Sequence, residues 1–594
     1  MYFRRNDGKV SYTKGEPGIL LEEDAAVYLD TYFNGFSIGK WRKYTRIEQV
    51  NLTLRFRGKA RVTLLWNERS RGQVIKHYLE EKVLESDGGE VSLPFWESGC
   101  MGIYSADILA LEDTVLYGGY YWTGLGEEQT DSVRLALDIC TFRREEFVKR
   151  NMALLGKTIF EKEMYRELRG GVRIYVVDNA GTLEKNELTA DSTLENHICL
   201  IKNRNVGGSG GFTRGLLEIR RDMEKYGHTH ALLMDDDIVI EPEAVFRTWR
   251  LLSLLKEEYK GAFVGGAMLR LDFPYLQTES GAVWNSGELI SRKQGVDLRS
   301  IEACLFNEIE ESVDFAAWWF CAVPLSVVRD DNLPIPVFIR GDDVEYGLRN
   351  AKNIIALNGI CVWHEPFENK YSSAMYYYIL RNRLIDNALH GRELEPRSFI
   401  RVMRNWVKSE VYLYRYKNAR LLLQGVSDYY RGIDWLKEQD GETLHGRVMG
   451  GGYRLQPVQE LDAVFDCGML DRALKDSDSY RLSRRVLRRT TLNGTFLKPR
   501  RRQGVVPTVD TRYCSVYRTE KILNYDEASR RGFVTVRDKK EARACMRQLR
   551  RLIRKTKRVY RDVNREYRER GREMMRRDFW ERYLGMEEKS NGRE

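Results

Sequence analysis

Short apolar and aromatic runs alternate with Gly, Asn and Ser from about residue 20 to residue 138. Residues 26–33, 50–56 and 61–66 follow the period of two that is typical of half-buried strands at short spacing. The pattern predicts that residues 1–135 form an all-β sandwich of the jelly-roll type. No residue pattern in this part suggests catalysis.

Four tryptophans in this part, Trp41, Trp66, Trp96 and Trp122, allow two interpretations. An aromatic-rich β-sandwich suggests carbohydrate binding. Aromatic side chains are mainly core material, however, because their burial removes a large apolar area from water. We therefore expect these tryptophans in the core.

From about residue 133 to residue 389, apolar runs alternate with amphipathic helical segments. Residues 172–178, 197–201 and 230–235 are nearly continuous apolar runs, and each ends in a polar residue or runs into one. Such runs are typical of strands buried on both faces of a mostly parallel, helix-covered sheet. We predict an α/β domain over residues 136–392, with ligands at the carboxyl ends of its strands.

The chain after residue 392 is expected to be mainly helical. Between Met546 and Tyr567 the apolar positions keep a spacing of three to four residues, while Arg and Lys occupy most other positions. This spacing predicts a helix with one apolar stripe and a basic remainder. The sequence thus predicts a multidomain protein with boundaries near residues 135 and 392.

The amino-acid composition excludes several classes of protein. Of 594 residues, 42% are hydrophobic and 31% are charged, which excludes a wholly disordered or fibrous chain. No run approaches the roughly 18 to 20 apolar residues that span a bilayer, and the chain does not begin with a secretion signal. The 9 cysteines contain no C-x-x-C pair, which argues against a disulfide framework and a thiolate zinc site. We therefore expect a cytoplasmic location.

The net charge of +10 is unevenly distributed. Residues 543–577 contain 15 Lys and Arg against 4 Asp and Glu, a net charge of +11, so the rest of the chain carries about −1. This basic tail suggests attraction to anionic lipid or to an anionic glycan carrier. A basic helix packed on the body, or in an oligomer interface, is the other interpretation.

Three consecutive acids, Asp235, Asp236 and Asp237, follow the apolar run that starts at His230. Ionised carboxylates are costly to bury unless they are paired or bind a cation, and oxygen ligands suit Mg²⁺ or Mn²⁺. In an extended segment Asp235 and Asp237 share one side, while Asp236 points to the other. The alternative is a solvated acidic turn.

The segment from Asn205 to Gly215 follows another strand and contains five glycines. Glycines allow close approach of backbone to a ligand, and a helix that starts here would favour phosphate at its N-terminus. The spacing matches neither a P-loop nor the G-x-G-x-x-G fingerprint. A flexible loop is the alternative.

Two further segments carry titratable side chains. Asp342 and Asp343 stand between an apolar strand and a helical segment, where they could serve as a general base or as acids that stabilise a helix N-terminus. His364 follows another apolar strand, as a structural residue or a metal ligand.

Taken in order, these segments resemble family 2 glycosyltransferases of the GT-A fold, a Rossmann-like nucleotide-sugar-binding fold. Within that family they resemble the bacterial galactofuranosyltransferases that polymerise cell-wall galactan. The resemblance rests on Thr141-Phe-Arg-Arg, Val177-Asp-Asn, Asn205-Val-Gly-Gly-Ser-Gly-Gly-Phe, Met234-Asp-Asp-Asp-Ile, Asp314-Phe-Ala-Ala-Trp-Trp, Phe338-Ile-Arg-Gly-Asp-Asp-Val-Glu-Tyr-Gly-Leu-Arg and Val362-Trp-His.

The resemblance implies roles for individual residues. Asp343 would be the catalytic base, with Asp342 beside it. The metal, Mn²⁺ or Mg²⁺, would be held by Asp235, Asp237 and His364. The donor would lie against residues of several segments: Arg143 and Asp178 at the uridine, and Asn205, Gly207, Gly208 and Asp236 at the nucleotide sugar. Trp318 and Trp319 would line the acceptor subsite, although adjacent residues of a regular strand point to opposite sides.

The resemblance also implies a reaction and its partners. A hydroxyl of a glycan or lipid-linked glycan would accept galactofuranose from UDP-galactofuranose, with inversion at the anomeric carbon. Members of this type are tetramers that associate peripherally with membranes, so a homo-oligomer on the inner face of the plasma membrane is expected.

Two residues depart from the family pattern. Gly341 stands where an aromatic residue is expected, which enlarges the space beside the base, and Glu345 replaces an Asp. One alternative function is therefore the same chemistry with another nucleotide sugar, such as a rhamnosyl donor. A second is a non-enzymatic protein that binds an anionic polymer such as nucleic acid through the basic tail. A binder has no need of an acidic triplet, a second acidic pair and a His in this order.

Overall fold

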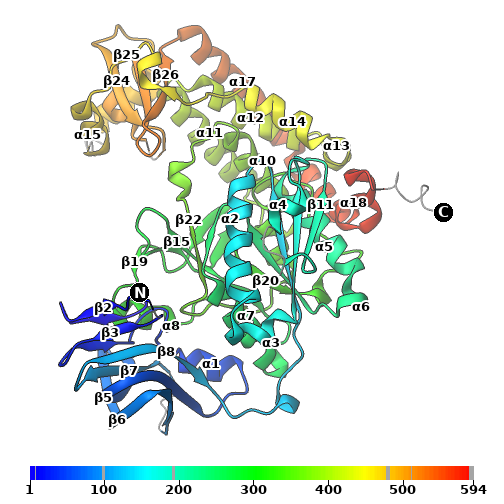
Figure 1. Ribbon diagram of the computed structural model, residues 1–594. Coiled ribbons are helices and arrows are strands. Elements are labelled where there is room, and N and C mark those ends of the chain that lie inside the picture. The colour runs from blue at the N-terminus through cyan, green and yellow to red at the C-terminus, as the bar shows by residue number, and fades with distance from the viewer. Residues whose placement is uncertain are drawn as a thin grey trace.

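The computed structural model of the protein describes residues 1–586 apart from residues 7, 16, 97–100, 190–193, 476–481 and 510. It contains an N-terminal β-sheet, a central α/β core, and C-terminal helices with a second small sheet (Figure 1). Several separate sheets are compatible with the predicted multidomain chain, while the boundaries at residues 135 and 392 stay predictions.

The N-terminal part is all-β, as predicted, with one short helix, α1 (Ile38–Tyr44). Strand β5 pairs with β8 over Asn51–Arg57 and with β7 over Ala60–Asn67. Because β5 pairs with both β7 and β8, the eight strands form one continuous sheet and not two separate sheets. The strands are β1 (Arg4–Arg5), β2 (Val10–Tyr12), β3 (Ile19–Leu21), β4 (Ala26–Tyr28), β5 (Val50–Ser70), β6 (Gln73–Phe95), β7 (Ile103–Ala110) and β8 (Thr114–Trp122).

The tryptophans of this part do not form its core. Trp96 is 73% exposed and Trp122 is 42% exposed, while Trp41 and Trp66 are only partly buried at the edges of core clusters. The indole N–H of Trp122 donates to Oγ1 of Thr53 at 2.9 Å. The core contains aliphatic side chains of β5 and β7 together with Phe56, Phe95 and Tyr104, so the expectation of core tryptophans is wrong for Trp96 and Trp122.

The central part contains a seven-stranded sheet in the order β11-β10-β9-β12-β20-β14-β21. The first four strands are parallel, whereas β20 runs antiparallel to its two neighbours, which agrees with the predicted mostly parallel sheet. The strands are β9 (Leu135–Thr141), β10 (Val172–Asp178), β11 (Ile198–Lys202), β12 (His230–Asp235), β14 (Phe263–Gly265), β20 (Cys321–Pro324) and β21 (Ile354–Ile355).

Both faces of this sheet are buried. On β10, Ile174 and Val176 belong to one hydrophobic cluster, while Tyr175 and Val177 belong to another. This alternation explains the nearly continuous apolar runs in the sequence. The helices of the central part are α2 (Glu145–Leu155), α3 (Arg166–Arg169), α4 (Lys185–Leu188), α5 (Gly207–Arg221), α6 (Met223–Tyr226), α7 (Pro242–Leu254), α8 (Ile301–Glu308) and α9 (Asp342–Asn350).

A second sheet extends the central part. Its order is β13-β22-β15-β16-β19, and a separate hairpin, β17 (Ala282–Asn285) and β18 (Glu288–Ser291), follows β16 in the chain. The strands of the sheet are β13 (Val239–Ile240), β15 (Ala267–Arg270), β16 (Leu276–Glu279), β19 (Val296–Asp297) and β22 (Cys361–His364).

The C-terminal part is helical, but it also contains a four-stranded sheet that the sequence analysis missed. The helices are α10 (Met375–Leu389), α11 (Pro396–Tyr412), α12 (Tyr416–Tyr429), α13 (Ile433–Glu438), α14 (Gly441–Gly450), α15 (Cys467–Lys475), α16 (Leu482–Thr490), α17 (Lys539–Arg570) and α18 (Arg577–Leu584). The strands are β23 (Gln456–Pro457), β24 (Arg501–Pro507), β25 (Thr519–Asp526) and β26 (Arg531–Val536). Strands β24, β25 and β26 carry only short apolar runs beside charged residues, and β23 has two residues, which hides the strand period.

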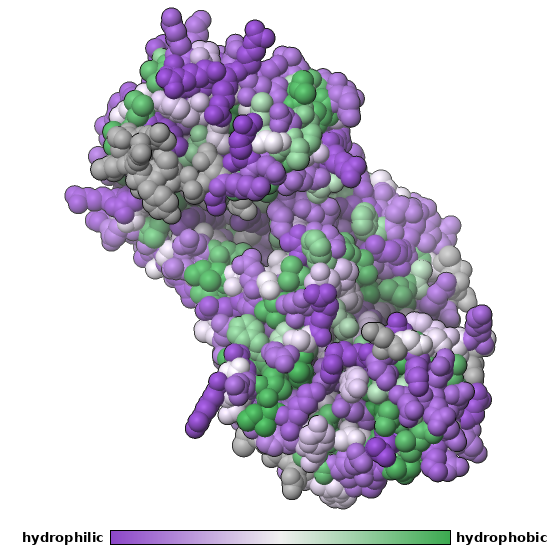
Figure 2. Space-filling view, turned by 90° about the vertical axis from the view of Figure 1, so that its left-hand side faces the viewer, coloured by the Kyte–Doolittle hydropathy of each residue, from purple (hydrophilic) through white to green (hydrophobic). Residues whose placement is uncertain are grey.

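Helix α17 contains the predicted apolar stripe. Leu549 and Tyr567 are buried, and the helix packs against α10, α11 and α12. The stripe thus lies on the body of the protein, and the arginines and lysines between its positions remain at the surface. On the face shown in Figure 2, hydrophilic side chains cover most of the surface, and hydrophobic ones form separate groups beside the hollow between two lobes.

Within the described part of the chain, no helix has both the length and the apolar character needed to cross a membrane.

Helix α18 and the turn before it contact the segment of the central part that leads to α9. Trp580 is fully buried, and its indole N–H donates to the carbonyl oxygen of Pro334 at 2.8 Å. The backbone N–H of Leu333 donates to the carbonyl oxygen of Met575 at 2.9 Å. Residues 333–334, just before α9, are therefore held by the end of the described chain.

A buried polar network joins the N-terminal part to the central part. The ammonium group of Lys40 on α1, 6% exposed, donates to the carbonyl oxygens of Asn307 at 2.8 Å and Ala356 at 2.7 Å. Beside it, Ser37 donates to Glu308 at 2.7 Å. Buried polar groups with hydrogen-bond partners are costly to disrupt, so this network fixes how the two parts meet.

We predict that Lys40→Met lowers the free energy of unfolding by roughly 2 kcal/mol, because two buried carbonyl oxygens lose their donor. The thermal midpoint measured by intrinsic fluorescence should fall. Lys43→Met is the matched control, since this lysine of the same helix has a 44% exposed side chain. Its ammonium group lies 3.3 Å from Glu310 and 4.8 Å from the centroid of the Tyr44 ring. Its effect should stay below about 0.5 kcal/mol. Equal shifts for both variants would contradict the prediction.

Candidate active site

Three side chains that could hold a metal ion meet at the ends of two strands. Asp235 ends β12, and His364 ends β22. Because β13 pairs with β22, with Val239 opposite Trp363, the segment that carries Asp237 lies beside His364. One ligand atom from each of Asp235, Asp237 and His364 lies within 4.8 Å of the others. The structure therefore brings together the three predicted ligands.

Asp236 points elsewhere, as the alternation of an extended segment predicts. It accepts hydrogen bonds from Oγ1 of Thr141 at 2.7 Å and from Nη1 of Arg144 at 2.9 Å. These contacts tie the acidic segment to the end of β9. Asp236 thus has protein partners of its own and is not one of the three clustered residues.

Two cations that the sequence analysis missed contact the cluster. Nζ of Lys370 lies 2.5 Å from Oδ2 of Asp237 and 3.2 Å from Nε2 of His364. Nη1 of Arg144 lies 2.9 Å from Oδ2 of Asp237. Arg144 belongs to the Thr141-Phe-Arg-Arg motif, next to the predicted Arg143, whereas nothing in the local sequence marks Lys370.

The electrostatics of the cluster favour a bound cation. Burial would raise the pKa of Asp237, but His364, Arg144 and Lys370 outweigh burial and lower it. Burial and the neighbouring Asp237 raise the pKa of Asp235. Asp235 has no cation of its own among the described residues, so positive charge here would stabilise its ionised form. Two carboxylates and an imidazole also form a donor set that divalent ions accept.

The glycine-rich segment forms the start of helix α5 and not a flexible loop. Gly207 has a φ of 78°, and a Cβ there would lie 2.0 Å from the carbonyl oxygen of Phe338. Further along the helix, a Cβ at Gly211 would lie 2.1 Å from Sγ of Cys140. The glycines therefore allow α5 to pack tightly against β9 and against the segment that precedes α9.

The other predicted nucleotide-binding residues lie around this helix start. Oδ1 of Asn205 accepts from the N–H of Gly207 at 3.2 Å. The two oxygens of Asp178 accept from the backbone N–H groups of Ala180 at 2.9 Å and Leu183 at 2.8 Å. Asp178 is thus held by its own turn, at the carboxyl end of β10.

Arg143 is exposed and lies over the ring of Phe142, 5.2 Å from its centroid. Its φ of 55° turns the chain away from the end of β9. The guanidinium is therefore at the surface, in the turn between β9 and α2.

Asp342 and Asp343 lie in the first turn of α9. This position suits acids that stabilise a helix N-terminus, and it also suits a general base. Oδ1 of Asp343 accepts from the N–H of Val344 at 2.8 Å, and a Cβ at Gly208 would lie 3.9 Å from Oδ2 of Asp342. Burial, followed by Asp343, raises the pKa of Asp342, and Asp235 adds to this rise. The acidic pair and the metal-ligand cluster therefore share one electrostatic environment.

Burial also raises the pKa of Asp343, although the N–H of Val344 and the Arg340 guanidinium oppose this rise. Its side chain is only half-buried, unlike that of Asp342. Of the pair, Asp343 is the more accessible to a substrate hydroxyl.

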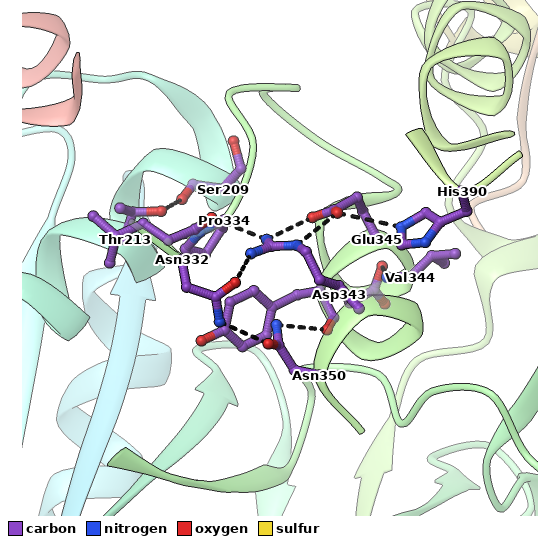
Figure 3. Close-up of polar contacts among 12 residues, drawn as sticks. Ser209, Thr213, Asn332, Pro334, Asp343, Val344, Glu345, Asn350 and His390 are labelled. Atoms are coloured by element: carbon purple, nitrogen blue, oxygen red, sulfur yellow. Dashed lines mark hydrogen bonds and ion pairs between the residues drawn. The ribbon is translucent and has the colours of Figure 1, made fainter. Parts of the chain in front are cut away.

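Glu345 holds α9 in place (Figure 3). Arg349 donates to both of its oxygens at 2.9 Å, and Nε2 of His390 lies 3.3 Å from Oε1. Burial would raise the pKa of Glu345, but Arg349 and His390 outweigh burial and lower it to about 2. Glu345 is fully buried, so this residue of the motif supports the helix that carries the acidic pair.

Trp318 and Trp319 lie in the turn before β20 and are 4% and 6% exposed. Trp318 packs edge-on against Phe212 and Tyr346 in one hydrophobic cluster. Trp319 belongs to another cluster and donates its indole N–H to Gly266 at 2.9 Å. The two side chains point to different sides, as expected, but both are buried. Their acceptor-binding role stays a prediction.

Comparisons with known proteins agree with the resemblance. Residues 5–129 match the profile of the family described as galactofuranosyltransferase 2 N-terminal. The chain is 26% identical over 393 residues to galactofuranosyltransferase GlfT2 of Mycolicibacterium smegmatis, covering 62% of this chain and 58% of the relative. It is also 26% identical over 395 residues to GlfT2 of Mycobacterium tuberculosis, covering 62% and 59%. The chain thus aligns with less than two thirds of these relatives.

Among solved structures, S. aureus TarS residues 1–349 superposes with a TM-score of 0.28 and 11% identity, over 57% of this chain and 98% of that one. The mannosyltransferase PcManGT from Pyrobaculum calidifontis, in complex with GDP-Man and Mn²⁺, gives a TM-score of 0.30 and 12% identity, over 55% and 81%. Structural similarities with TM-scores this low specify neither the fold nor the function of this chain. The sequence matches, in contrast, confirm the resemblance of this chain to galactofuranosyltransferases.

Proposed function

We propose that the protein is an inverting, metal-dependent glycosyltransferase that transfers galactofuranose from UDP-galactofuranose to a hydroxyl of a glycan or lipid-linked glycan. The observation that carries this proposal is that α5 packs beside two acidic groups, the cluster of Asp235, Asp237 and His364 and the pair of Asp342 and Asp343. Asp235 lies opposite Cys140 on β9, and the glycines of α5 approach both Cys140 and Asp342. A metal site beside a partly accessible carboxylate can serve both the departing and the attacking side of a displacement.

Each group has a chemical task in this proposal. Asp235, Asp237 and His364 would hold Mn²⁺ or Mg²⁺, which would supply positive charge for the departing diphosphate. Lys370 and Arg144 add fixed positive charge beside Asp237. Asp343 accepts the proton of the acceptor hydroxyl as that oxygen attacks the anomeric carbon. A single displacement from the opposite face inverts that carbon.

The donor would lie along the edge formed by the ends of β9, β10 and β11. The residues proposed for it are Arg143, Asp178, Asn205, Gly207, Gly208 and Asp236. The start of α5 supports this placement, because a helix N-terminus favours phosphate. The N–H groups of Gly207 and Ser209 already donate to Oδ1 of Asn205 and to the carbonyl oxygen of Phe338. Asp178 and Asp236 already accept hydrogen bonds from the protein, so their contribution would be to shape the site.

The choice of galactofuranose rests on the sequence similarity. Another nucleotide sugar, such as a rhamnosyl donor, is the alternative substrate, since Gly341 departs from the expected aromatic residue. A homo-oligomer and a peripheral membrane contact also belong to the proposal. The basic surface of α17 supports attraction to anionic lipid, but its apolar stripe is occupied by packing on the body, so charge alone would drive this contact.

We expect UDP release from UDP-galactofuranose in the presence of Mn²⁺ or Mg²⁺ and a galactofuranosyl oligosaccharide. Asp343→Asn should lower kcat by about 10²- to 10⁴-fold, because it removes the base and keeps the shape. Asp237→Asn should lower both activity and Mn²⁺ affinity, measured by calorimetry. Asp297→Asn is the control, since this acid on β19 pairs only with Arg299 at the surface and should leave activity unchanged.

The outcomes separate the alternatives. Release only from a rhamnosyl donor would keep the chemistry and overturn the galactofuranose assignment. Full activity of Asp343→Asn would overturn the assignment of the base. Absence of turnover with every donor and acceptor tested, together with salt-sensitive binding of nucleic acid, would favour the anionic-polymer binder.

As the pH is lowered, kcat should fall with a midpoint above the ordinary pKa of an aspartate. Burial raises the pKa of Asp343 from 3.8, and the base works only when ionised, so kcat should fall as the pH drops through a midpoint above 3.8. The measurement is kcat between about pH 4 and pH 8, with samples returned to pH 7 to show reversibility. A kcat that stays constant down to pH 4 would contradict the prediction.

A further inference from the structure

The segment just before the proposed base has a strained backbone. Phe338 has a φ of 75°, Arg340 a φ of 65° and Gly341 a φ of 104°. The left-handed region is open to glycine, but it is unfavourable for residues with a Cβ. Other contacts must therefore hold Phe338 and Arg340 in this conformation.

Asn382 on α10 makes such contacts. Its Nδ2 donates to the carbonyl oxygen of Ile339 at 2.8 Å and to that of Arg340 at 2.6 Å. Its Oδ1 accepts from Nε of Arg381 at 2.8 Å, which fixes the orientation of the amide. Asn382 is 1% exposed, so water does not compete for these hydrogen bonds.

The other side of the segment is held at Phe338. The backbone N–H of Phe338 donates to Oγ of Ser209 at 3.1 Å, and its ring stacks on His445 with a centroid distance of 4.8 Å. In the described part of the chain, no side chain other than Asn382 donates to the carbonyl oxygens of Ile339 and Arg340. The backbone conformation of Arg340 thus depends on Asn382, whereas that of Phe338 is held by Ser209 and His445.

The next turns of α10 face the same elements. A Cβ at Gly341 would lie 2.6 Å from Oδ2 of Asp386, which is 1% exposed. One turn later, His390 pairs with Glu345 on α9. A side chain at position 341 would therefore collide with α10 as well as require a left-handed backbone, which accounts for the glycine at this position.

We propose that Asn382 is a positioning residue for Asp343, an inference that rests on the proposed function. By holding Arg340 in the left-handed region, it fixes where α9 begins. Asp343 lies three residues after Arg340, in the first turn of that helix. Relaxation of Arg340 to an ordinary conformation would shift the first turn and move the carboxylate away from the metal-ligand cluster.

Hydrogen–deuterium exchange on the full chain tests the structural step without any substrate. Asn382→Leu keeps the size of the side chain and removes both donors, so amide exchange across residues 338–343 should accelerate at least about tenfold. Asn387→Leu is the control on the same helix, because the side chain of Asn387 accepts from the indole of Trp284 and does not contact residues 338–343, so the variant should leave that segment protected. Unchanged exchange in Asn382→Leu would overturn the proposal.

The catalytic step is tested in the transferase assay. Asn382→Leu should lower kcat by about tenfold to a hundredfold, because a small misplacement of a catalytic group is costly, while KM for the donor stays within about twofold. The acid limb of the kcat profile should also move, which a loss of folded protein would not cause. If the leucine variant fails to fold, Asn382→Asp serves instead, because it keeps the size of the side chain and replaces the amide donors with carboxylate acceptors. It should lower kcat and move the acid limb in the same way.

The two experiments fail in different ways. A wild-type chain inactive with every donor would count against the proposed function, while the exchange result would still decide whether Asn382 holds the segment. An active wild type whose Asn382→Leu variant keeps its kcat and its acid limb would overturn the positioning role.

Discussion

The main constraint on this molecule is the concentration of carboxylates at one edge of its central sheet. Asp235, Asp236, Asp237, Asp342 and Asp343 lie in two short segments, and three of the five, Asp236, Asp237 and Asp342, are buried. Buried carboxylates require positive charge or hydrogen-bond donors. The protein meets part of this demand with Arg144, Lys370, His364 and backbone N–H groups, and the remainder suits a divalent ion.

Close packing brings the two acidic segments together. Helix α5 begins with glycines, so it approaches both β9 and the Phe338 carbonyl at distances that a Cβ would forbid. Helix α9 is then placed against α5, with Asp342 facing Gly208. On its other side, α9 is tied to α10 by Glu345 and His390. The site is therefore built by neighbouring helices that each depend on a small residue or a buried pair.

The sequence was sufficient for elements with a strong local pattern. The apolar strands β10 and β12, the stripe of α17 and the metal-ligand cluster follow from periodicity, from strand ends and from ordered motifs. Lys370 could not be predicted, because its role depends on a chain turn that places it beside residues far away in sequence. The C-terminal sheet was missed because its strands are short and flanked by charge. The exposed Trp122 shows that an aromatic residue on a strand does not reveal which face it occupies.

The contact between α18 and residues 333–334 has a consequence for synthesis. Leu333 and Pro334 receive their partners from Met575 and Trp580, more than 240 residues later in the chain. During translation, N-terminal parts generally fold first. The central sheet can thus form early, but the segment that leads into α9 acquires its final support only when Met575 and Trp580 emerge. A ribosome-bound chain that lacks these residues would carry a formed sheet and an unfinished candidate site.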